Sequence, residues 1–434
     1  AAAPSGSMTR YEAAALLNTC LGEVAQVNEE ERRLLNEFSP ELAVIKGRVD
    51  SLEARVGEFE AGLFSTTTKL RGTTNFVIGA VDEEDNATDA TVFVYSMQLD
   101  LTSSFTGKDV LYTRIKTGNF GNSQLAQKPN VYLSSANTND DTLKVDKIWY
   151  QFPVGDSITA WLGAKVENYY MLASAPSIYR PILKGFALGG NDAVYGASTG
   201  QGFGVAWTQQ VDDPSAARFA VSANYTSSNS KGEYADPTAG GLFTNGAQGM
   251  TLAKVEYGSP RWQVSVAYSN KTNGSDAGTY YSTTMGDDRT GNTDAYALRA
   301  YWKPETTGAI PSISAGYTVA SVDDDGTAEE VEETASWMVG LNWKDAFIDG
   351  NTAGVAFGQR QYATSVTSGN RVDHYDKGDD NFNWEAYYSF KVSDGITVTP
   401  AVFGVSNPDG DDNSVGDGGN GDTFGGIVQT TFKF

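Results

Sequence analysis

Apolar and polar side chains alternate with a period of two from about residue 65 to the C-terminus. In 91–102, 262–269 and 382–391, residues of one parity are apolar with aromatics near the ends, and the others are mostly polar or small. Successive side chains of a strand point to opposite faces, so this pattern predicts strands between an apolar and an aqueous environment. The segments with this pattern are 68–81, 91–102, 109–118, 144–152, 157–166, 200–208, 217–226, 250–257, 262–269, 293–302, 311–320, 334–343, 352–361, 382–391, 396–404 and 422–434.

The connections between these segments alternate in length. The short ones are 103–108, 153–156, 209–216, 258–261, 303–310, 344–351 and 392–395. The others, apart from 82–90, are longer. Outer-membrane barrels alternate short periplasmic turns with long external loops, whereas a soluble sandwich has no reason to do so. We therefore predict an all-β transmembrane barrel of about 16 antiparallel strands over residues 65–434.

A second period precedes the barrel segment. From Leu35 to Leu63, apolar residues follow one another at alternating spacings of three and four, which is the heptad pattern of a coiled coil. The flanking pairs are opposite in sign: Glu41 with Lys46, Arg48 with Glu53, and Arg55 with Glu60. A parallel homo-oligomer requires such pairs, and a helix on a globular core would show them only by chance. We predict an α-helical coiled coil over residues 22–64, with these oligomerisation residues: Leu42, Ile45, Val49, Leu52, Val56 and Phe59.

Residues 8–21 predict a short helix, since Thr9 and Glu12 form a capping box. The stretch 8–18 resembles the closing part of an S-layer homology module, whose Thr-Arg-x-Glu signature lies in its wall-polymer-binding region. The resemblance implies that residues 1–21 are the end of a wall-binding module. It assigns wall binding to Thr9, Arg10 and Glu12. A capped amphipathic helix is the alternative.

The barrel segment also resembles known proteins. Phe434 closes an alternating segment, which resembles the recognition signal of bacterial outer-membrane barrels. Residues 147–156 and 388–400 resemble the carbohydrate-selective porin family, and the order of all three segments is similar to the major outer-membrane porins of cyanobacteria. This resemblance covers nearly the whole chain and implies passive transport. Relatives are described as sugar-selective, ion-conducting or iron-uptake porins, so the solute stays open.

Composition argues against most other functions. The chain has 54 acidic and 31 basic residues, and the net charge of −23 argues against nucleic acid as a partner. Cys20 and His374 are the only cysteine and histidine, so no disulfide or zinc cluster can form within the chain. The motif at 196–200 matches a nucleophile elbow, and 416–421 matches a dinucleotide fingerprint, but each leads into a strand pattern instead of a helix. We expect no enzyme and no cofactor.

Acidic loops are the one place where a metal deserves consideration. Asp409, Asp411 and Asp412 lie among Gly and Asn, and oxygen ligands on a pliable loop suit Ca²⁺. The spacing departs from the EF-hand pattern because Ser414 stands where that loop needs Gly. Solvated acidic loops are more common, so we predict no metal site and retain these three only as calcium candidates.

The polar face of the predicted barrel is mainly basic. The acids on that face are chiefly Asp100, Glu256 and Glu385. The longest external loop, about 167–199, carries aromatic and basic residues, and in porins a long third loop commonly folds inward. We expect these pore and constriction residues: Arg114, Lys116, Lys147, Lys165, Tyr169, Tyr170, Arg180, Lys184, Arg218, Arg299 and Arg360. A basic lumen favours small anions. The alternatives are that the cations pair with carboxylates, and that the aromatics stack on a sugar.

The sequence therefore predicts a homotrimeric diffusion porin for small hydrophilic solutes and inorganic ions. Its barrel would contact the lipid bilayer and lipopolysaccharide of the bacterial outer membrane. Its N-terminal segment would lie in the periplasm against peptidoglycan or wall polysaccharide. The alternatives are a carbohydrate-selective porin, a chiefly structural tether between membrane and wall, and a secreted acidic β-protein that binds glycans.

Overall fold

The computed structural model describes residues 67–83, 90–127, 131–190, 193–196, 199–228, 230–272, 291–323, 329–368, 381–406 and 422–434. The predicted wall-binding segment and coiled coil lie outside these residues, as do the calcium candidates Asp409, Asp411 and Asp412. The chain divides into two units, residues 1–69 and 70–434. In the described residues, no helix is both long and apolar enough to cross a membrane.

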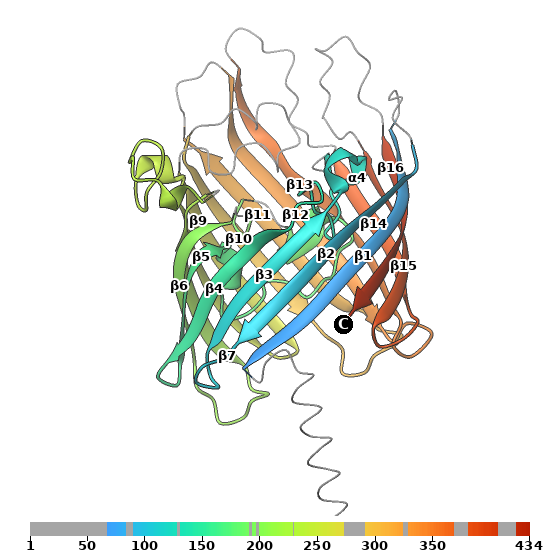
Figure 1. Cartoon of the computed structure of the whole chain (residues 1–434), viewed down its shortest axis with the longest axis horizontal. Coiled ribbons are helices and arrows are strands. Elements are labelled where there is room, and N and C mark those ends of the chain that lie inside the picture. The colour runs from blue at the N-terminus through green and yellow to red at the C-terminus, as the bar shows by residue number, and fades with distance from the viewer. Residues whose placement is uncertain are drawn as a thin grey trace, which may run out of the picture. The chain divides into compact units, whose positions relative to one another are not determined.

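Sixteen strands in the described residues form a closed barrel in which strands consecutive in the chain are neighbours (Figure 1). The strands are β1 (Thr68–Glu83), β2 (Val92–Ser103), β3 (Val110–Gly118), β4 (Lys144–Val154), β5 (Ile158–Val166), β6 (Gly200–Thr208), β7 (Arg218–Thr226), β8 (Met250–Ser259), β9 (Trp262–Lys271), β10 (Thr293–Trp302), β11 (Ser312–Val322), β12 (Glu329–Lys344), β13 (Thr352–Ser368), β14 (Phe382–Lys391), β15 (Ile396–Ser406) and β16 (Thr423–Lys433). The predicted antiparallel barrel is confirmed.

The barrel closes between the first and the last strand. β1 pairs antiparallel with β16, from Thr73 opposite Lys433 to Glu83 opposite Thr423. Gly72 and Phe434 then exchange two backbone hydrogen bonds, with N···O distances of 2.7 and 3.1 Å. The C-terminal residue is therefore part of the seam that leaves the sheet without an open edge.

The predicted strand bounds agree with the observed ones to within two residues, except in β12 and β13. These two strands continue past the predicted 334–343 and 352–361 at the end of the barrel that carries the long loops. Their added length contains register shifts between Val331 and Thr334. The β12 extension, 329–333, is rich in glutamate and does not alternate, and the β13 extension, 362–368, is mostly small or hydroxyl residues, so the period of two could not predict either one.

The barrel wall is apolar outside and polar inside. On β9, Val264 and Val266 expose 45% and 55% of their surface, whereas Ser265 between them exposes 2%. Ring pairs lie near both ends of the wall, with centroids 4.5 Å apart for Phe219 and Tyr257, and 5.2 Å apart for Tyr268 and Tyr296. A belt of outward apolar residues between two aromatic rims is the surface that a bilayer covers.

Candidate functional site

The described part of the segment between β5 and β6, residues 167–190 and 193–196, runs along the inside of the barrel wall. It contains the short helices η3 (Asn168–Tyr170) and η4 (Lys184–Gly189). Near its start, the side-chain amide of Asn224 on β7 donates to the carbonyls of Asn168 and Met171, at 3.0 and 3.3 Å. The backbone N–H of Ala173 donates to Ser222 Oγ at 2.9 Å. Both partners on β7 are inward-facing and buried.

The middle of this segment continues along β8, β9 and β11. Lys254 Nζ on β8 donates to the carbonyl of Ser174 at 2.9 Å, and Gln263 Nε2 on β9 donates to Ser174 Oγ at 2.5 Å. The N–H of Ile178 donates to Ser314 Oγ on β11 at 3.2 Å. Lys254 also forms an ion pair with Glu256 on its own strand. The wall thus presents its polar groups to the backbone of the segment.

Glu385 on β14 is a second buried charge that holds the segment, after Lys254. Its Oε1 accepts from Tyr179 Oη at 2.8 Å and from the N–H of Ile182 at 3.0 Å, while its Oε2 accepts from the N–H of Leu183 at 2.6 Å. The side chain is fully buried. A buried carboxylate needs such donors, because burial without them would be very costly.

Arg299 on β10 is a third buried charge that holds the segment, with 1% of its surface exposed. Its Nε and Nη2 donate to the carbonyls of Leu188 and Gly190 at 3.2 and 2.7 Å. Its Nη1 donates to the carbonyl of Tyr317 at 2.8 Å, so one guanidinium joins segment and wall. Gly190 has a φ of +94°, a conformation that a residue with a Cβ rarely adopts.

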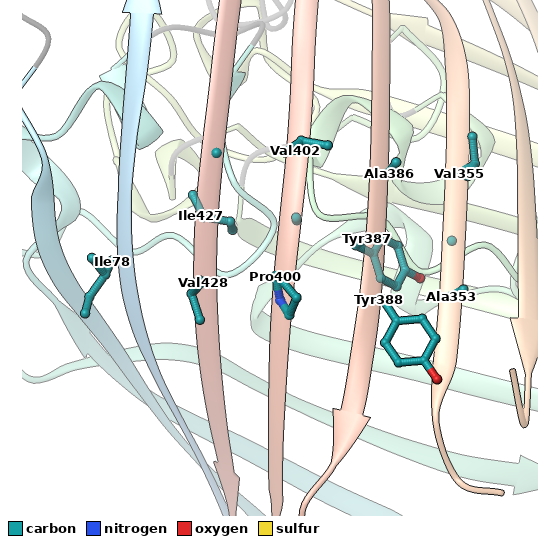
Figure 2. Close-up of a pocket in the computed structure, with 13 residues that line it drawn as sticks. Ile78, Ala353, Val355, Ala386, Tyr387, Tyr388, Pro400, Val402, Ile427 and Val428 are labelled. Carbon is teal, nitrogen blue, oxygen red and sulfur yellow. The ribbon is translucent and has the colours of Figure 1, made fainter. Parts of the chain in front are cut away.

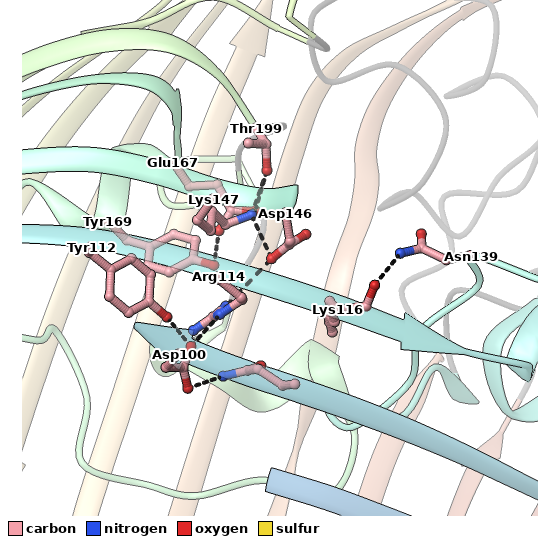
Figure 3. A network of polar contacts seen from close by, with 11 residues as sticks. Asp100, Tyr112, Arg114, Lys116, Asn139, Asp146, Lys147, Glu167, Tyr169 and Thr199 are labelled. Atoms are coloured by element: carbon pink, nitrogen blue, oxygen red, sulfur yellow. Dashed lines mark hydrogen bonds and ion pairs between the residues drawn. The ribbon is translucent and has the colours of Figure 1, made fainter. Parts of the chain in front are cut away.

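A cluster of charges lies on β2, β3 and β4 opposite the start of the segment (Figure 3). Arg114 Nε lies 3.1 Å from Asp100 Oδ1, and Arg114 Nη1 lies 3.7 Å from Asp146 Oδ2. Lys147 Nζ lies 3.4 Å from Asp146 Oδ2 and 3.2 Å from Glu167 Oε1. Cations and carboxylates therefore alternate in this cluster, and Lys147 is buried within it.

Aromatic rings border the charged cluster. Tyr112 and Trp149 stack with centroids 4.8 Å apart, and Tyr169 and Tyr170 stack at 4.9 Å. The guanidinium of Arg114 lies 5.5 Å from the Tyr112 centroid and 5.8 Å from that of Tyr170. Burial raises the pKa of Tyr170 to about 12, so its phenol is neutral at physiological pH. A cation between π-faces is held by the ring quadrupoles as well as by carboxylates.

The structure brings some of the sequence-predicted residues together and separates others. Arg114 contacts Tyr170, which stacks on Tyr169, and Lys147 is joined to Arg114 through Asp146. Lys116 follows Arg114 by two residues on β3. Lys184 Nζ lies 4.9 Å from the Tyr132 ring centroid.

The other predicted residues lie outside the cluster. Arg180 is exposed, and Arg360 on β13 is buried, where it packs closely against Gly185 of η4. Arg299 on β10 contacts Leu188 and Gly190 of the segment, neither of which belongs to the cluster. Lys165 is half-buried beside a register irregularity, and Arg218 donates to the carbonyl of Pro214 at the short β6–β7 turn.

Sequence patterning missed two acids of the cluster. Asp146 is next to Lys147, so strict alternation would place it on the outer face of β4. The register shifts at this point: Arg114 pairs with Lys147, but Ile115 pairs with Val145, so Asp146 is the extra residue of a bulge. Glu167 directly follows β5 and carried no periodic signal.

Two further features bear on ligand binding. In the part of the chain that the structure describes, no group of three His, Cys, Asp or Glu could hold a metal ion. A shallow hollow of about 560 Å³ lies on β13–β16 and β1 (Figure 2). Its outward-facing lining includes Ile78, Val402 and Val428, so it suits an acyl chain better than a hydrophilic solute.

The sequence matches a known protein family over most of its length. The model of the family described as "Carbohydrate-selective porin, OprB family" matches residues 29–434. An uncharacterized protein of Nostoc sp. strain PCC 7120 is 29% identical, with 99% of this chain and 78% of that protein covered. An uncharacterized protein of Synechocystis sp. strain PCC 6803 is 27% identical, with 98% and 82% covered.

Two solved structures show the same fold. Pseudomonas putida OprB, in a structure at high pH, has a TM-score of 0.58 at 12% identity, with 85% of this chain and 94% of that chain covered. Salmonella typhi OmpF, in complex with daunomycin, has a TM-score of 0.54 at 13% identity, with 85% and 97% covered. At these identities the likeness extends to the barrel and not to individual site residues.

Proposed function

This chain belongs to the carbohydrate-selective porin family OprB, and from that premise we propose that it is a passive diffusion porin for small hydrophilic solutes and inorganic ions. The family and the closed barrel make it a porin-type outer-membrane channel and not an enzyme. A sixteen-strand barrel is wide enough to leave an aqueous channel. The observation that carries the proposal is the segment 167–199, whose ties to Glu385, Arg299 and Lys254 would make it a fixed constriction.

We assign the selectivity of this constriction to the basic groups nearest to it. Asp100, Asp146 and Glu167 pair with Arg114 and Lys147, which offsets those two cations. Arg180 is exposed on the segment, Lys184 Nζ lies 4.9 Å from the Tyr132 ring centroid, and Lys116 lies on the wall strand β3. Rings of charge at a narrow point set ion selectivity through the local potential. These three cations therefore favour small inorganic anions.

The double substitution Arg180→Ala with Lys184→Ala is expected to shift the reversal potential toward cations and to raise the single-channel conductance. Both changes follow because two positive charges and two long side chains leave the constriction. Planar-bilayer recordings under a salt gradient measure both quantities. Lys303→Ala, at a short turn, is the matched control. Cation preference of the unmodified channel would remove the anion assignment, and a complete absence of conductance steps would remove the channel proposal.

Carbohydrate passage is the second candidate, and a specific observation favours it. Tyr169 and Tyr170 stack at the start of the segment, beside the Arg114–Asp100 pair. Aromatic faces next to hydrogen-bonding charges suit a sugar ring, which has both apolar and hydroxyl faces. Swelling of liposomes in glucose and oligosaccharides separates this candidate from an ion channel, because only sugar passage lets the vesicles swell. A barrel that passes neither ions nor sugars would fit a structural tether.

We further propose that residues 22–64 form a parallel coiled coil that joins three copies, and that residues 1–21 contact peptidoglycan in the periplasm. The heptad residues and the opposite flanking charges support the first part, and the S-layer homology resemblance supports the second. Removal of residues 1–64 should abolish co-sedimentation with peptidoglycan and reduce the trimer fraction measured by light scattering. Full sedimentation of the shortened protein would contradict the tether.

A further inference from the structure

Tyr225 is covered although it lies on the outward face of β7. Phe219 and Val221 share its parity and expose 49% and 41% of their surface, whereas Tyr225 exposes 7%. It is paired directly with Phe203 on β6, which is also outward and 43% exposed. A residue in this position should contact lipid. Part of the protein must therefore cover it from outside the barrel.

The connection between β7 and β8 provides the cover. The Phe243 ring centroid lies 4.6 Å from that of Tyr225 and 5.9 Å from that of Phe203. The N–H of Phe243 donates to Tyr225 Oη at 3.1 Å. A Cβ on Gly249 would lie 2.8 Å from the Tyr225 ring, so glycine is needed for this approach. The connection projects from the side of the barrel near β6 and β9, as the yellow-green lobe of Figure 1.

The tip of this connection turns apolar side chains outward at some conformational cost. Phe243 has a φ of +62°, which is uncommon for a residue other than glycine and strained for a bulky one. Thr244 Oγ1 donates to the carbonyls of Gly240 and Gly241 at 2.5 and 3.0 Å, which fixes the turn. In this arrangement Phe243 is 70% exposed and Leu242 is 42% exposed. A strained backbone that exposes a phenylalanine indicates a contact outside the chain.

We propose that this tip docks on the lipid bilayer, with Leu242 and Phe243 at the boundary between headgroups and acyl chains. The tip is continuous with the lipid-facing wall through Phe203 and lies at the same end as the Tyr268–Tyr296 rim. Aromatic side chains are enriched at this depth of membrane proteins. Docking rests on the proposed function only in that the barrel must lie in a bilayer.

A lipid surface fits this patch better than a second copy of the chain. A stable protein interface buries about 800 Å² on each partner, far more than two side chains supply. The exposed stretch 233–239 carries the acidic residues Glu233 and Asp236 and one large ring, Tyr234, whose phenol gives it a polar end. An exposed leucine and phenylalanine side by side at the tip, in a connection that elsewhere carries Glu233, Tyr234 and Asp236, match the steep polarity gradient of a membrane surface.

The test places a fluorophore at the tip of the full-length protein. Cys20→Ser removes the native thiol, and Phe243→Cys or Leu242→Cys accepts an NBD label; the second variant leaves the strained residue intact. Ala235→Cys marks the polar part of the connection, and Val266→Cys marks the lipid-facing wall. The proteins are reconstituted in phosphatidylcholine vesicles that carry headgroup or acyl-chain nitroxides, and iodide serves as the aqueous quencher.

We expect labels at 242 and 243 to emit at shorter wavelength than a label at 235, and to lose more intensity to headgroup nitroxides than to iodide. If iodide quenched the labels at 242 and 243 as strongly as the label at 235, while acyl-chain nitroxides quenched the label at 266, the barrel would lie in the bilayer without the tip. That result would overturn the docking proposal and leave the proposed function intact. A label at 266 that escapes every lipid nitroxide would remove the barrel from the bilayer. That result would overturn the proposed function together with the docking.

Discussion

Replacing Glu385 with alanine is expected to raise the single-channel conductance and to add fluctuations to the open-channel current. The substitution leaves Tyr179 Oη and the N–H groups of Ile182 and Leu183 without their acceptor. Each unsatisfied buried donor costs about 1–3 kcal/mol, so the segment loses at least about 3 kcal/mol of attachment. That loss is roughly a hundred-fold change in the attachment equilibrium. Planar-bilayer recordings at constant salt report both the mean current and its noise.

Two control variants make the Glu385 result specific. Glu385→Gln keeps the volume, but its amide group would direct N–H donors at N–H donors of the segment, so it should restore attachment only in part. Glu305→Ala removes a carboxylate whose side chain is 78% exposed in its ion pair with Arg261, and should leave the current unchanged. Conductance and noise of Glu385→Ala equal to those of the unmodified channel would show that segment 167–199 does not constrict the pore.

The barrel could be predicted from sequence because its physical cause is local and repeated. Lipid on one side and water on the other select side chains of alternating polarity at every strand, as Val264, Ser265 and Val266 show. Where that selection ends, prediction ends too. At the long-loop end of β12, residues 329–333 do not alternate, and the observed strand is longer than the predicted one.

The site was less predictable because its main contacts join side chains to backbone groups. The sequence predicts that segment 167–199 folds inward and that Arg299 and Glu385 lie on the polar face of the barrel. However, Glu385 accepts from the N–H of Leu183, and Arg299 donates to the carbonyl of Gly190. Every residue type has these backbone groups, so no sequence pattern could identify the partners. Asp146 was missed for a different reason, because a single bulge reverses the parity of the strand.

The buried charges alter the view of a basic lumen. Lys147 forms ion pairs with Asp146 and Glu167, and Arg299 is surrounded by carbonyls, so neither presents an open cationic surface. The wall charges thus divide into those that position the segment, such as Glu385 and Arg299, and those assigned to ion selectivity, such as Lys116. Glu385 accepts from the N–H groups of residues 182 and 183, and Arg299 donates to the carbonyls of residues 188 and 190, so each of these two parts of the segment is held by the charge that its backbone can satisfy.

Replacing Arg299 with lysine is expected to destabilise the protein nearly as much as replacing it with alanine. The guanidinium donates at once to the carbonyls of Leu188, Gly190 and Tyr317, and to Thr318 Oγ1 at 2.8 Å. Lysine keeps the charge, but its compact ammonium cannot reproduce the planar fork that spans segment and wall. Hydrogen bonds to a charged group contribute about 1.5–3 kcal/mol each, so the loss of two or more costs at least about 3 kcal/mol.

Urea unfolding in lipid vesicles measures the free energy of the Arg299 variants, and bilayer recordings show whether the segment has detached. Arg218→Lys is the matched control, because that guanidinium donates to a single carbonyl, Pro214, at a short turn. It should unfold at nearly the same urea concentration as the unmodified protein. If Arg299→Lys were equally stable, the positive charge and not the fork geometry would hold the segment. If both Arg299 variants kept stability and conductance, the segment would need no tie at residues 188–190, and the fixed constriction would rest on Glu385 and Lys254.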